Sequence, residues 1–212
     1  MSNHDDGGAH IRVRRYSGSA RINHWIVAIS FVLAALSGLA VFHPSMFWLA
    51  NLFGGGPWTR ILHPFIGVVM FVFFAITMVR FWGHNRFDAN DRKWLGKWRD
   101  VLANREERLP ESGRYNAGQK AMFWLMVVCM LVLLVTGIMF WRSLFGDYFS
   151  VNVIRAASLL HAVAATALII GIIVHIYAAI WTKGSFGAMV RGTVSEAWAR
   201  KHHAAWYRQV NR

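Results

Sequence analysis

Four long stretches of this sequence are apolar and carry few charged residues. They cover approximately residues 23–42, 58–82, 119–141 and 152–182. A helix needs roughly 20 residues to cross the hydrocarbon core of a bilayer, and each stretch is at least that long. Strands of a membrane barrel would alternate apolar and polar residues, which these stretches do not do. The sequence therefore predicts an all-α, four-transmembrane-helix bundle.

We expect one integral membrane domain that covers residues 1–212. Between the second and third stretches, residues 91–103 place apolar side chains at helical spacing among lysines and arginines. This pattern is typical of an amphipathic helix that lies on a membrane surface. Residues 186–208, which mix tryptophan and tyrosine with basic residues, predict a second segment of this kind.

The distribution of basic residues predicts the orientation of the helices. The formal net charge is +13, and nearly all of the 23 Lys and Arg residues lie before residue 22, between Arg80 and Lys120, or from Lys183 onward; the exceptions are Arg60, Arg142 and Arg155. Lysine and arginine are enriched on the cytoplasmic side of membrane proteins. Both termini and the long central loop are therefore expected in the cytoplasm. We interpret the excess charge as topology and lipid attraction, not as a nucleic-acid site.

Two histidines in the last apolar stretch share one face of a helix. His161 and His175 are 14 residues apart. On an α-helix this separation is about 21 Å along the axis, and the rotation falls about 40° short of four full turns. Both rings are therefore expected on nearly the same face at two depths, with His161 nearer the outer side of the membrane and His175 nearer the cytoplasm.

Each of these histidines has a partner at a matching depth. His24 lies at the inner end of the first stretch, and His63 lies near the outer end of the second. Two rings that face each other across a bundle can hold one haem iron from both sides. We predict that His24 and His175 hold an inner haem iron, and that His63 and His161 hold an outer one. The single cysteine, Cys129, lies in no C-x-x-C-H motif for covalent haem attachment.

Other histidines and other metals are competing interpretations. His43 and His84 flank helix ends nearer the headgroups, so we favour the four deeper histidines as ligands. The remaining four are expected on the solvated surface, and these are His4, His10, His202 and His203. Zinc favours tetrahedral clusters with more ligands, and a proton relay would usually include intramembrane Asp or Glu, which the four stretches lack. A histidine-based metal-cation transporter stays a second alternative.

An amide-rich turn precedes the third apolar stretch. Asn116 and Gln119 would lie at the inner membrane boundary, and Gly118 would let a ligand approach the backbone. A lipid quinone needs hydrogen-bond partners for its two carbonyls and an apolar slot for its tail. These three residues are the candidate quinone site. The competing interpretation is an ordinary helix start with Asn116 as its N-cap.

Four longer motifs carry a resemblance to a known family. RINHWI (21–26), RILHPFIGVVMF (60–71), GRYNAGQK (113–120) and AWARKHHAAWYRQV (197–210) closely resemble the cytochrome b (gamma) subunit of respiratory membrane-bound formate dehydrogenase. The resemblance covers nearly the whole chain from about residue 14 onward. It implies a di-haem cytochrome b type of fold with two haem b groups. In that family the corresponding axial ligands fall on His24, His63, His161 and His175, and the quinone contacts fall on Asn116, Gly118 and Gln119.

The resemblance also implies a place in the inner membrane of a bacterium, partners and a direction of electron transfer. The expected complex contains an iron–sulfur beta subunit and a molybdenum catalytic alpha subunit, and a higher oligomer of the complex is compatible with it. Electrons from formate would reach the outer haem, then the inner haem and then menaquinone on the cytoplasmic side. This subunit would therefore not carry the formate chemistry itself. The alternative is the cytochrome b subunit of a nickel–iron hydrogenase or of another periplasmic oxidoreductase.

Overall fold

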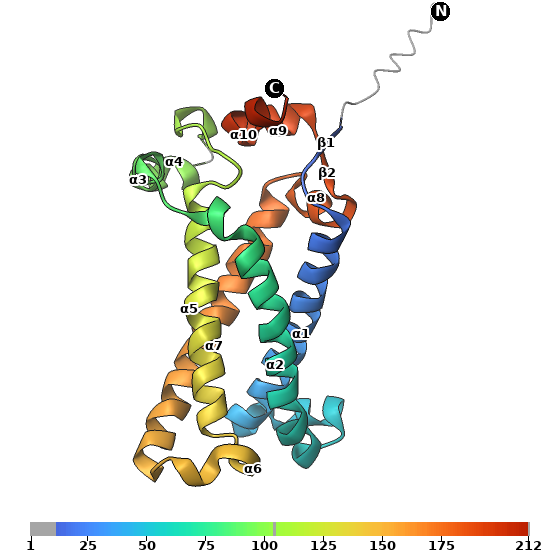
Figure 1. Cartoon of the computed structure of the whole chain (residues 1–212), viewed down its shortest axis with the longest axis vertical. Helices are drawn as coiled ribbons and strands as arrows, with labels where there is room; N and C mark the ends of the chain where they lie inside the picture. Colours follow the sequence, from blue (N-terminus) through green and yellow to red (C-terminus); the bar gives the residue numbers. More distant parts are fainter. Residues whose placement is uncertain (1–11, 104, 212) are drawn as a thin grey trace, which may run out of the picture. The chain divides into compact units, whose positions relative to one another are not determined.

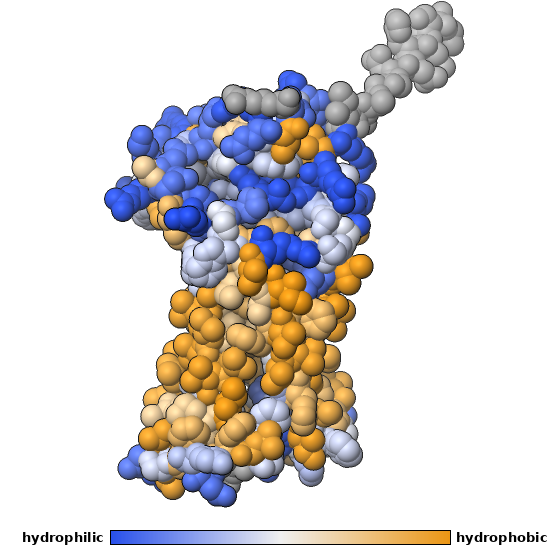
Figure 2. Space-filling view, in the orientation of Figure 1, coloured by the Kyte–Doolittle hydropathy of each residue, from blue (hydrophilic) through white to orange (hydrophobic). Residues whose placement is uncertain are grey.

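The computed structural model describes residues 12–103 and 105–211. Within these ranges the chain divides into two compact units. The membrane unit consists of Ile22–Asn85 and Ala121–Ala178, and the terminal unit consists of the remaining described residues. Figure 2 shows apolar side chains over the visible face of the membrane unit and mainly hydrophilic ones over the visible face of the terminal unit. The surface of the first suits lipid, and that of the second suits water.

Four long helices supply the membrane unit. They are α1 (Gly18–Phe42), α2 (Gly56–Phe81), α5 (Ala117–Met139) and α7 (Val151–Trp181) (Figure 1). All four are long and apolar enough to cross a membrane, which confirms the predicted all-α, four-helix membrane bundle. The first helix begins earlier than predicted because the hydroxyl of Ser17 accepts a hydrogen bond from the backbone N–H of Ala20 (3.2 Å) and caps it.

Apolar side chains from all four helices meet in the core of the membrane unit. The buried cluster consists of Ala34, Met70, Phe74, Val127, Cys129, Met130 and Leu168. One buried polar side chain, Asn23 of α1, donates from Nδ2 to the carbonyl of Phe73 (2.9 Å) and to the hydroxyl of Thr77 (2.6 Å) on α2. Lipid offers no hydrogen-bond partners, so this internal pairing fixes α1 against α2.

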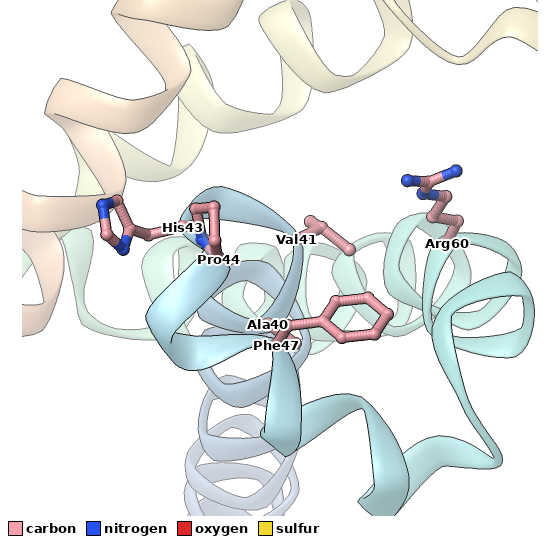
Figure 3. A pocket seen from close by; sticks show the side chains of 6 residues that line it. All are labelled: Ala40, Val41, His43, Pro44, Phe47 and Arg60. Carbon is pink, nitrogen blue, oxygen red and sulfur yellow. The ribbon is translucent and has the colours of Figure 1, made fainter.

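A 3-10 segment, η1 (Pro44–Phe53), connects α1 to α2. Gly54 and Gly55 follow it with φ values of 86° and 96°, a conformation that glycine adopts without a steric penalty. The buried hydroxyl of Thr59 donates to the carbonyl of Gly55 (2.8 Å) and closes the turn. Beside this connection is an open pocket, shown in Figure 3, lined by Ala40, Val41, His43, Pro44, Phe47 and Arg60.

Shorter elements complete the chain. Two helices, α3 (Ala89–Gly96) and α4 (Trp98–Leu102), occupy the first predicted surface segment. Three others follow α7 and cover the second: α8 (Ser185–Arg191), α9 (Glu196–His202) and α10 (Ala204–Val210). Their attachment to a membrane surface stays a prediction. The remaining connections are η2 (Trp82–Asn85), η3 (Glu106–Arg108), α6 (Arg142–Phe145) and η4 (Gly146–Tyr148).

A two-stranded sheet joins two segments of the terminal unit that are far apart in the sequence. Strand β1 (Arg12–Arg14) pairs antiparallel with β2 (Thr193–Ser195), and Val13 lies opposite Val194. Neither strand was predicted, because three residues are too few to show a period in the sequence. The pairing places the segment before α1 against a segment that follows α7.

A buried histidine lies at the centre of the terminal unit. The prediction of a solvated surface position is wrong for His203, which is 2% exposed. Its Nδ1–H donates to the carbonyl of Gly113 (2.8 Å), and its Nε2 accepts from Nη2 of Arg15 (3.3 Å). Burial, with the positive charge of Arg15 as a second cause, lowers the pKa of His203 to about 3. The ring is therefore neutral at pH 7. His202 is partly exposed, and outside the described residues lie His4 and His10.

Candidate functional site

His63 and His161 face each other within the membrane unit. His63 lies on α2 and His161 on α7, and the centroids of their rings are 6.3 Å apart with the ring planes inclined by 65°. The two side chains are far apart in the sequence, and the arrangement of α2 and α7 within the membrane unit brings their rings together. They are the two residues that the sequence predicted as the outer pair.

His24 and His175 form a second pair in the same unit. His24 lies on α1 and His175 on α7, with ring centroids 6.5 Å apart and planes inclined by 44°. His175 and His161 lie on the same helix, separated by about 21 Å along its axis. The structure therefore contains two facing imidazole pairs at two levels along α7.

The spacing within both pairs fits one metal ion between two imidazoles. A metal–imidazole bond is about 2 Å long, and a ring nitrogen lies roughly 1 Å from its ring centre, so such a site needs about 6 Å between centroids. The observed 6.3 and 6.5 Å agree with this requirement. A direct hydrogen bond between the rings, about 2.9 Å from nitrogen to nitrogen, would bring the centroids to about 5 Å.

The surroundings of the rings also bear on what the rings can hold. A Cβ on Gly38 would lie 3.2 Å from Cε1 of His63, and a Cβ on Gly137 would lie 3.5 Å from Cε1 of His161, so the missing side chains of two glycines let the outer rings lie close to α1 and α5. At the inner pair, Nδ1 of His24 is buried and has no hydrogen-bond partner in the part of the chain that the structure describes. The residues present therefore fit two bis-histidine haem sites.

The competing histidines take part in neither pair. His43 is exposed, its Nδ1 accepts from the backbone N–H of Ser45 (3.2 Å), and its ring lies on the open pocket of Figure 3. His84 lies in η2, with its ring 6.4 Å from that of Phe81. Residues 12–103 and 105–211 contain no group of three or more His, Cys, Asp or Glu side chains that could hold a metal ion. A clustered zinc site therefore has no basis in these residues.

The candidate quinone residues lie in the first turn of α5. The backbone N–H of Asn116 donates to Oε1 of Gln119 (3.1 Å), and the backbone N–H of Gln119 donates to Oδ1 of Asn116 (2.9 Å). This reciprocal pair is a helix cap, so Asn116 does cap the helix. The cap uses only the side-chain oxygens. The amide NH₂ groups of both side chains are donors, and they stay available to a ligand carbonyl.

An aromatic ring that the sequence did not connect with this turn covers Gly118. A Cβ on Gly118 would lie 3.2 Å from Cη2 of Trp94, which belongs to α3. The indole therefore lies against the backbone of Gly118, in the space that a side chain at this position would take. The sequence placed Trp94 on an amphipathic helix, but no local pattern relates it to a residue in another helix. A quinone at this turn would contact Trp94 as well as the two amides.

Comparison with known proteins identifies the family. Residues 15–192, which include both imidazole pairs and the turn at Asn116, match the family described as prokaryotic cytochrome b561. The chain belongs to this family. Membership implies haem b and a multi-pass membrane protein, in agreement with the four long apolar helices. The cytochrome b prediction is thereby confirmed at the level of the family.

Individual relatives show which proteins this chain is similar to. The cytochrome b556(fdo) subunit of formate dehydrogenase from Escherichia coli K12 is 49% identical over 198 residues, which cover 93% of each chain. The cytochrome b556(Fdn) subunit of the nitrate-inducible formate dehydrogenase from the same strain is 45% identical over 192 residues, 91% of this chain and 88% of the relative. A formate dehydrogenase cytochrome b556 subunit from Haemophilus influenzae is 42% identical over 198 residues, 93% of this chain and 83% of the relative. These relatives confirm the resemblance inferred from the four motifs.

Proposed function

We propose that this chain is the di-haem b membrane subunit of a formate dehydrogenase, and that it passes electrons from a periplasmic-side iron–sulfur partner to menaquinone at the cytoplasmic side. The observation that carries the proposal is the spacing of two imidazole pairs, 6.3 and 6.5 Å between centroids, along one helix. The names of the relatives support formate dehydrogenase as the complex.

Four histidines perform the central task. His63 and His161 would hold the iron of the outer haem, and His24 and His175 that of the inner haem. When bound, each haem supplies reversible one-electron transfer. Two histidines would hold each haem, an arrangement that suits electron transfer and not oxygen binding. The helices partly bury the four rings and hold the two pairs at two levels along α7, which suits electron transfer across a membrane.

The distribution of charge supports the orientation. Both termini and the loop before α5 are rich in Lys and Arg, which favours their placement in the cytoplasm of a bacterium. The turn at Asn116 would then receive protons from the cytoplasm. Formate chemistry would belong to a molybdenum catalytic subunit, with the iron–sulfur subunit between it and the outer haem.

The amides of Asn116 and Gln119 give the proposed quinone site its chemistry. A quinone carbonyl accepts hydrogen bonds and therefore needs donors. Both side chains offer NH₂ groups while their oxygens are held in the helix cap. The indole of Trp94 adds an apolar surface against which a planar ring can pack.

The haem content of the purified complex tests the proposal. We expect two b-type haems per chain from the reduced-minus-oxidised spectrum. We also expect His63→Ala and His161→Ala each to remove the outer haem and keep the inner one. One haem or none in the unsubstituted chain would contradict the proposal, and bound zinc or nickel without a Soret band would favour a transporter. Co-purification of a nickel–iron subunit in place of a molybdenum subunit would assign the donor to a hydrogenase.

A further inference from the structure

We propose that Ser37 and Thr136 are positioning residues for the outer haem, whose hydroxyls accept hydrogen bonds from His63 and His161 and thereby lower the reduction potential of the iron between these rings. The inference rests on the proposed function, because it needs a haem at the outer pair. It assigns a role to two helix residues that do not contact the iron, and it distinguishes the two haem sites from each other.

Each outer histidine lies against a buried hydroxyl on a neighbouring helix. Oγ of Ser37 on α1 is 2.8 Å from Nδ1 of His63, and Oγ1 of Thr136 on α5 is 2.9 Å from Nδ1 of His161. Ser37 is 0% exposed and Thr136 is 3% exposed. Water therefore cannot replace either hydroxyl as the partner of its ring.

Each hydroxyl also lies within hydrogen-bond distance of a carbonyl in its own helix. Oγ of Ser37 is 2.8 Å from the carbonyl oxygen of Leu33, and Oγ1 of Thr136 is 2.6 Å from that of Val132. In the proposed arrangement each hydroxyl donates its proton to this carbonyl and accepts from Nδ1 of its histidine, so Nδ1 carries a proton. In a neutral imidazole this leaves the lone pair on Nε2, the nitrogen that remains for the iron.

The same two-residue pattern occurs on both helices. Ser37 is followed by Gly38, and Thr136 is followed by Gly137, and each glycine lies beside the ring that the preceding hydroxyl binds. The hydroxyl fixes the rotation of the ring, and the missing side chain of the glycine lets the ring lie close to the helix. A chance hydrogen bond would have no reason to repeat with the same neighbour on the opposite side of the site.

The inner pair lacks this arrangement at His24. Among the described residues, the buried Nδ1 of His24 has no hydrogen-bond partner. A ring N–H that donates to an acceptor makes the imidazole a stronger electron donor to its metal, which stabilises the oxidised iron. The two hydroxyls should therefore lower the potential of the outer haem, and this favours movement of electrons toward the inner site.

Potentials of the two haems in the intact complex test the inference. Redox titration of the visible spectrum should resolve two midpoints in the unsubstituted protein. Ser37→Ala and Thr136→Val should each shift the outer midpoint to more positive values, with a larger shift in the double variant, and should leave the inner midpoint unchanged. Thr136→Ser keeps the hydroxyl and should retain the original potential.

A matched control is available on the same helix as Ser37. Ser30 is buried, and its hydroxyl donates to the carbonyl of Ile26 (2.6 Å) without a histidine partner. Ser30→Ala should leave both midpoints in place, and a shift equal to that of Ser37→Ala would overturn the inference. Unchanged midpoints in Ser37→Ala and Thr136→Val would also overturn it, while two haems per chain would leave the proposed function intact.

Loss of the haem in a variant is equally informative. If Thr136→Val loses the outer haem and Thr136→Ser keeps it, the hydroxyl is required and the inference is supported. If both variants lose it, the hydroxyl is not the cause and the inference fails. Fewer than two haems in the unsubstituted protein would instead contradict the proposed function itself.

Discussion

The ammonium group of Lys120 lies 2.7 Å from Oδ2 of Asp91, and both side chains are buried. The same carboxylate oxygen accepts the backbone N–H of Asp88 (2.7 Å), and a carboxylate oxygen of Asp88 lies 3.4 Å from Lys120. One network therefore joins the N-cap of α3 to the first turn of α5. Because that turn also holds Asn116 and Gln119, the network supports the proposed quinone site.

Removing one partner of this buried ion pair should loosen α3. Lys120→Met leaves the carboxylate of Asp91 buried without its counter-charge, which we expect to cost about 3 kcal/mol of local stability. Hydrogen exchange of the α3 amides should become correspondingly faster. The double variant Lys120→Met/Asp91→Asn keeps a cap acceptor without a buried charge and should recover part of the protection. The exposed Lys93 provides the control, and an equal effect of Lys93→Met would show that the pair is not responsible.

Substitution of Asn116 can separate its capping role from a role in quinone binding. Asn116→Asp keeps an oxygen for the N–H of Gln119 and adds a charge that suits a helix N-terminus, so the cap should persist. It removes the NH₂ donor. We expect both haems to be retained and reduced by formate, while menaquinone reduction falls by about tenfold or more, the effect of one lost hydrogen bond.

Asn116→Ala completes this comparison. It removes both the cap and the donor, and it should also spare both haems while it impairs quinone reduction. Intact quinone turnover in Asn116→Asp and Asn116→Ala would refute the assignment of the quinone site to this turn.

Titration of His203 should make the terminal unit sensitive to acid. Burial and the charge of Arg15 lower its pKa from 6.5 to about 3 in the folded state. Between these two values the unfolded chain binds more protons than the folded chain, so stability falls as the pH decreases. The free energy of unfolding should change by at most about 1.4 kcal/mol per pH unit. Above pH 6.5 the ring of His203 is neutral in both states, and its titration no longer lowers the stability.

Hydrogen exchange of α9 and α10 between pH 7 and pH 4 measures this loss, after correction for the intrinsic exchange rates. His203→Gln preserves an amide donor and acceptor but does not titrate, so its protection should vary less with pH. The neighbouring substitution His202→Gln should keep the slope of the unsubstituted protein. A slope that is unchanged in His203→Gln would show that another group is responsible.

Helical geometry explains why the histidine pairs were predictable. Within an apolar stretch the helix period fixes both face and depth, so the spacing of His161 and His175 determines where partners must lie. The structure brings His63 and His24 to those positions, and ligation of iron stays a prediction. The four helices were predictable for the same reason, because a bilayer imposes both length and composition.

Contacts between residues that lie far apart in the sequence leave no comparable pattern in it. A serine or threonine in a helix usually bonds the carbonyl four residues earlier, and both Ser37 and Thr136 do so. The neighbouring helix adds a histidine as a further partner of each oxygen. The burial of His203 depends likewise on Arg15 and Gly113, which are far away in sequence. The basic C-terminal segment, taken alone, favours a solvated position for His203, and this prediction is wrong.

The two glycines beside the outer rings should respond differently to alanine. At Gly38 the new Cβ would lie 3.2 Å from Cε1 of His63, so the ring must move by a few tenths of an ångström. At Gly137 the distance of 3.5 Å to His161 is an ordinary van der Waals contact. Alanine is a better helix former than glycine by up to about 1 kcal/mol, so helix propensity would favour both substitutions. A loss of the outer haem in Gly38→Ala would therefore report displacement of the His63 ring.

We expect Gly38→Ala to lower the occupancy of the outer haem and to alter its low-temperature electron paramagnetic resonance signal, while Gly137→Ala keeps both features. Haem per chain and the resonance spectrum of the purified complex measure these effects. The displaced ring would also lengthen its bond to Ser37, so the spectrum of Gly38→Ala should resemble that of Ser37→Ala. Equal behaviour of the two alanine variants would mean that the space beside His63 does not control the orientation of its ring.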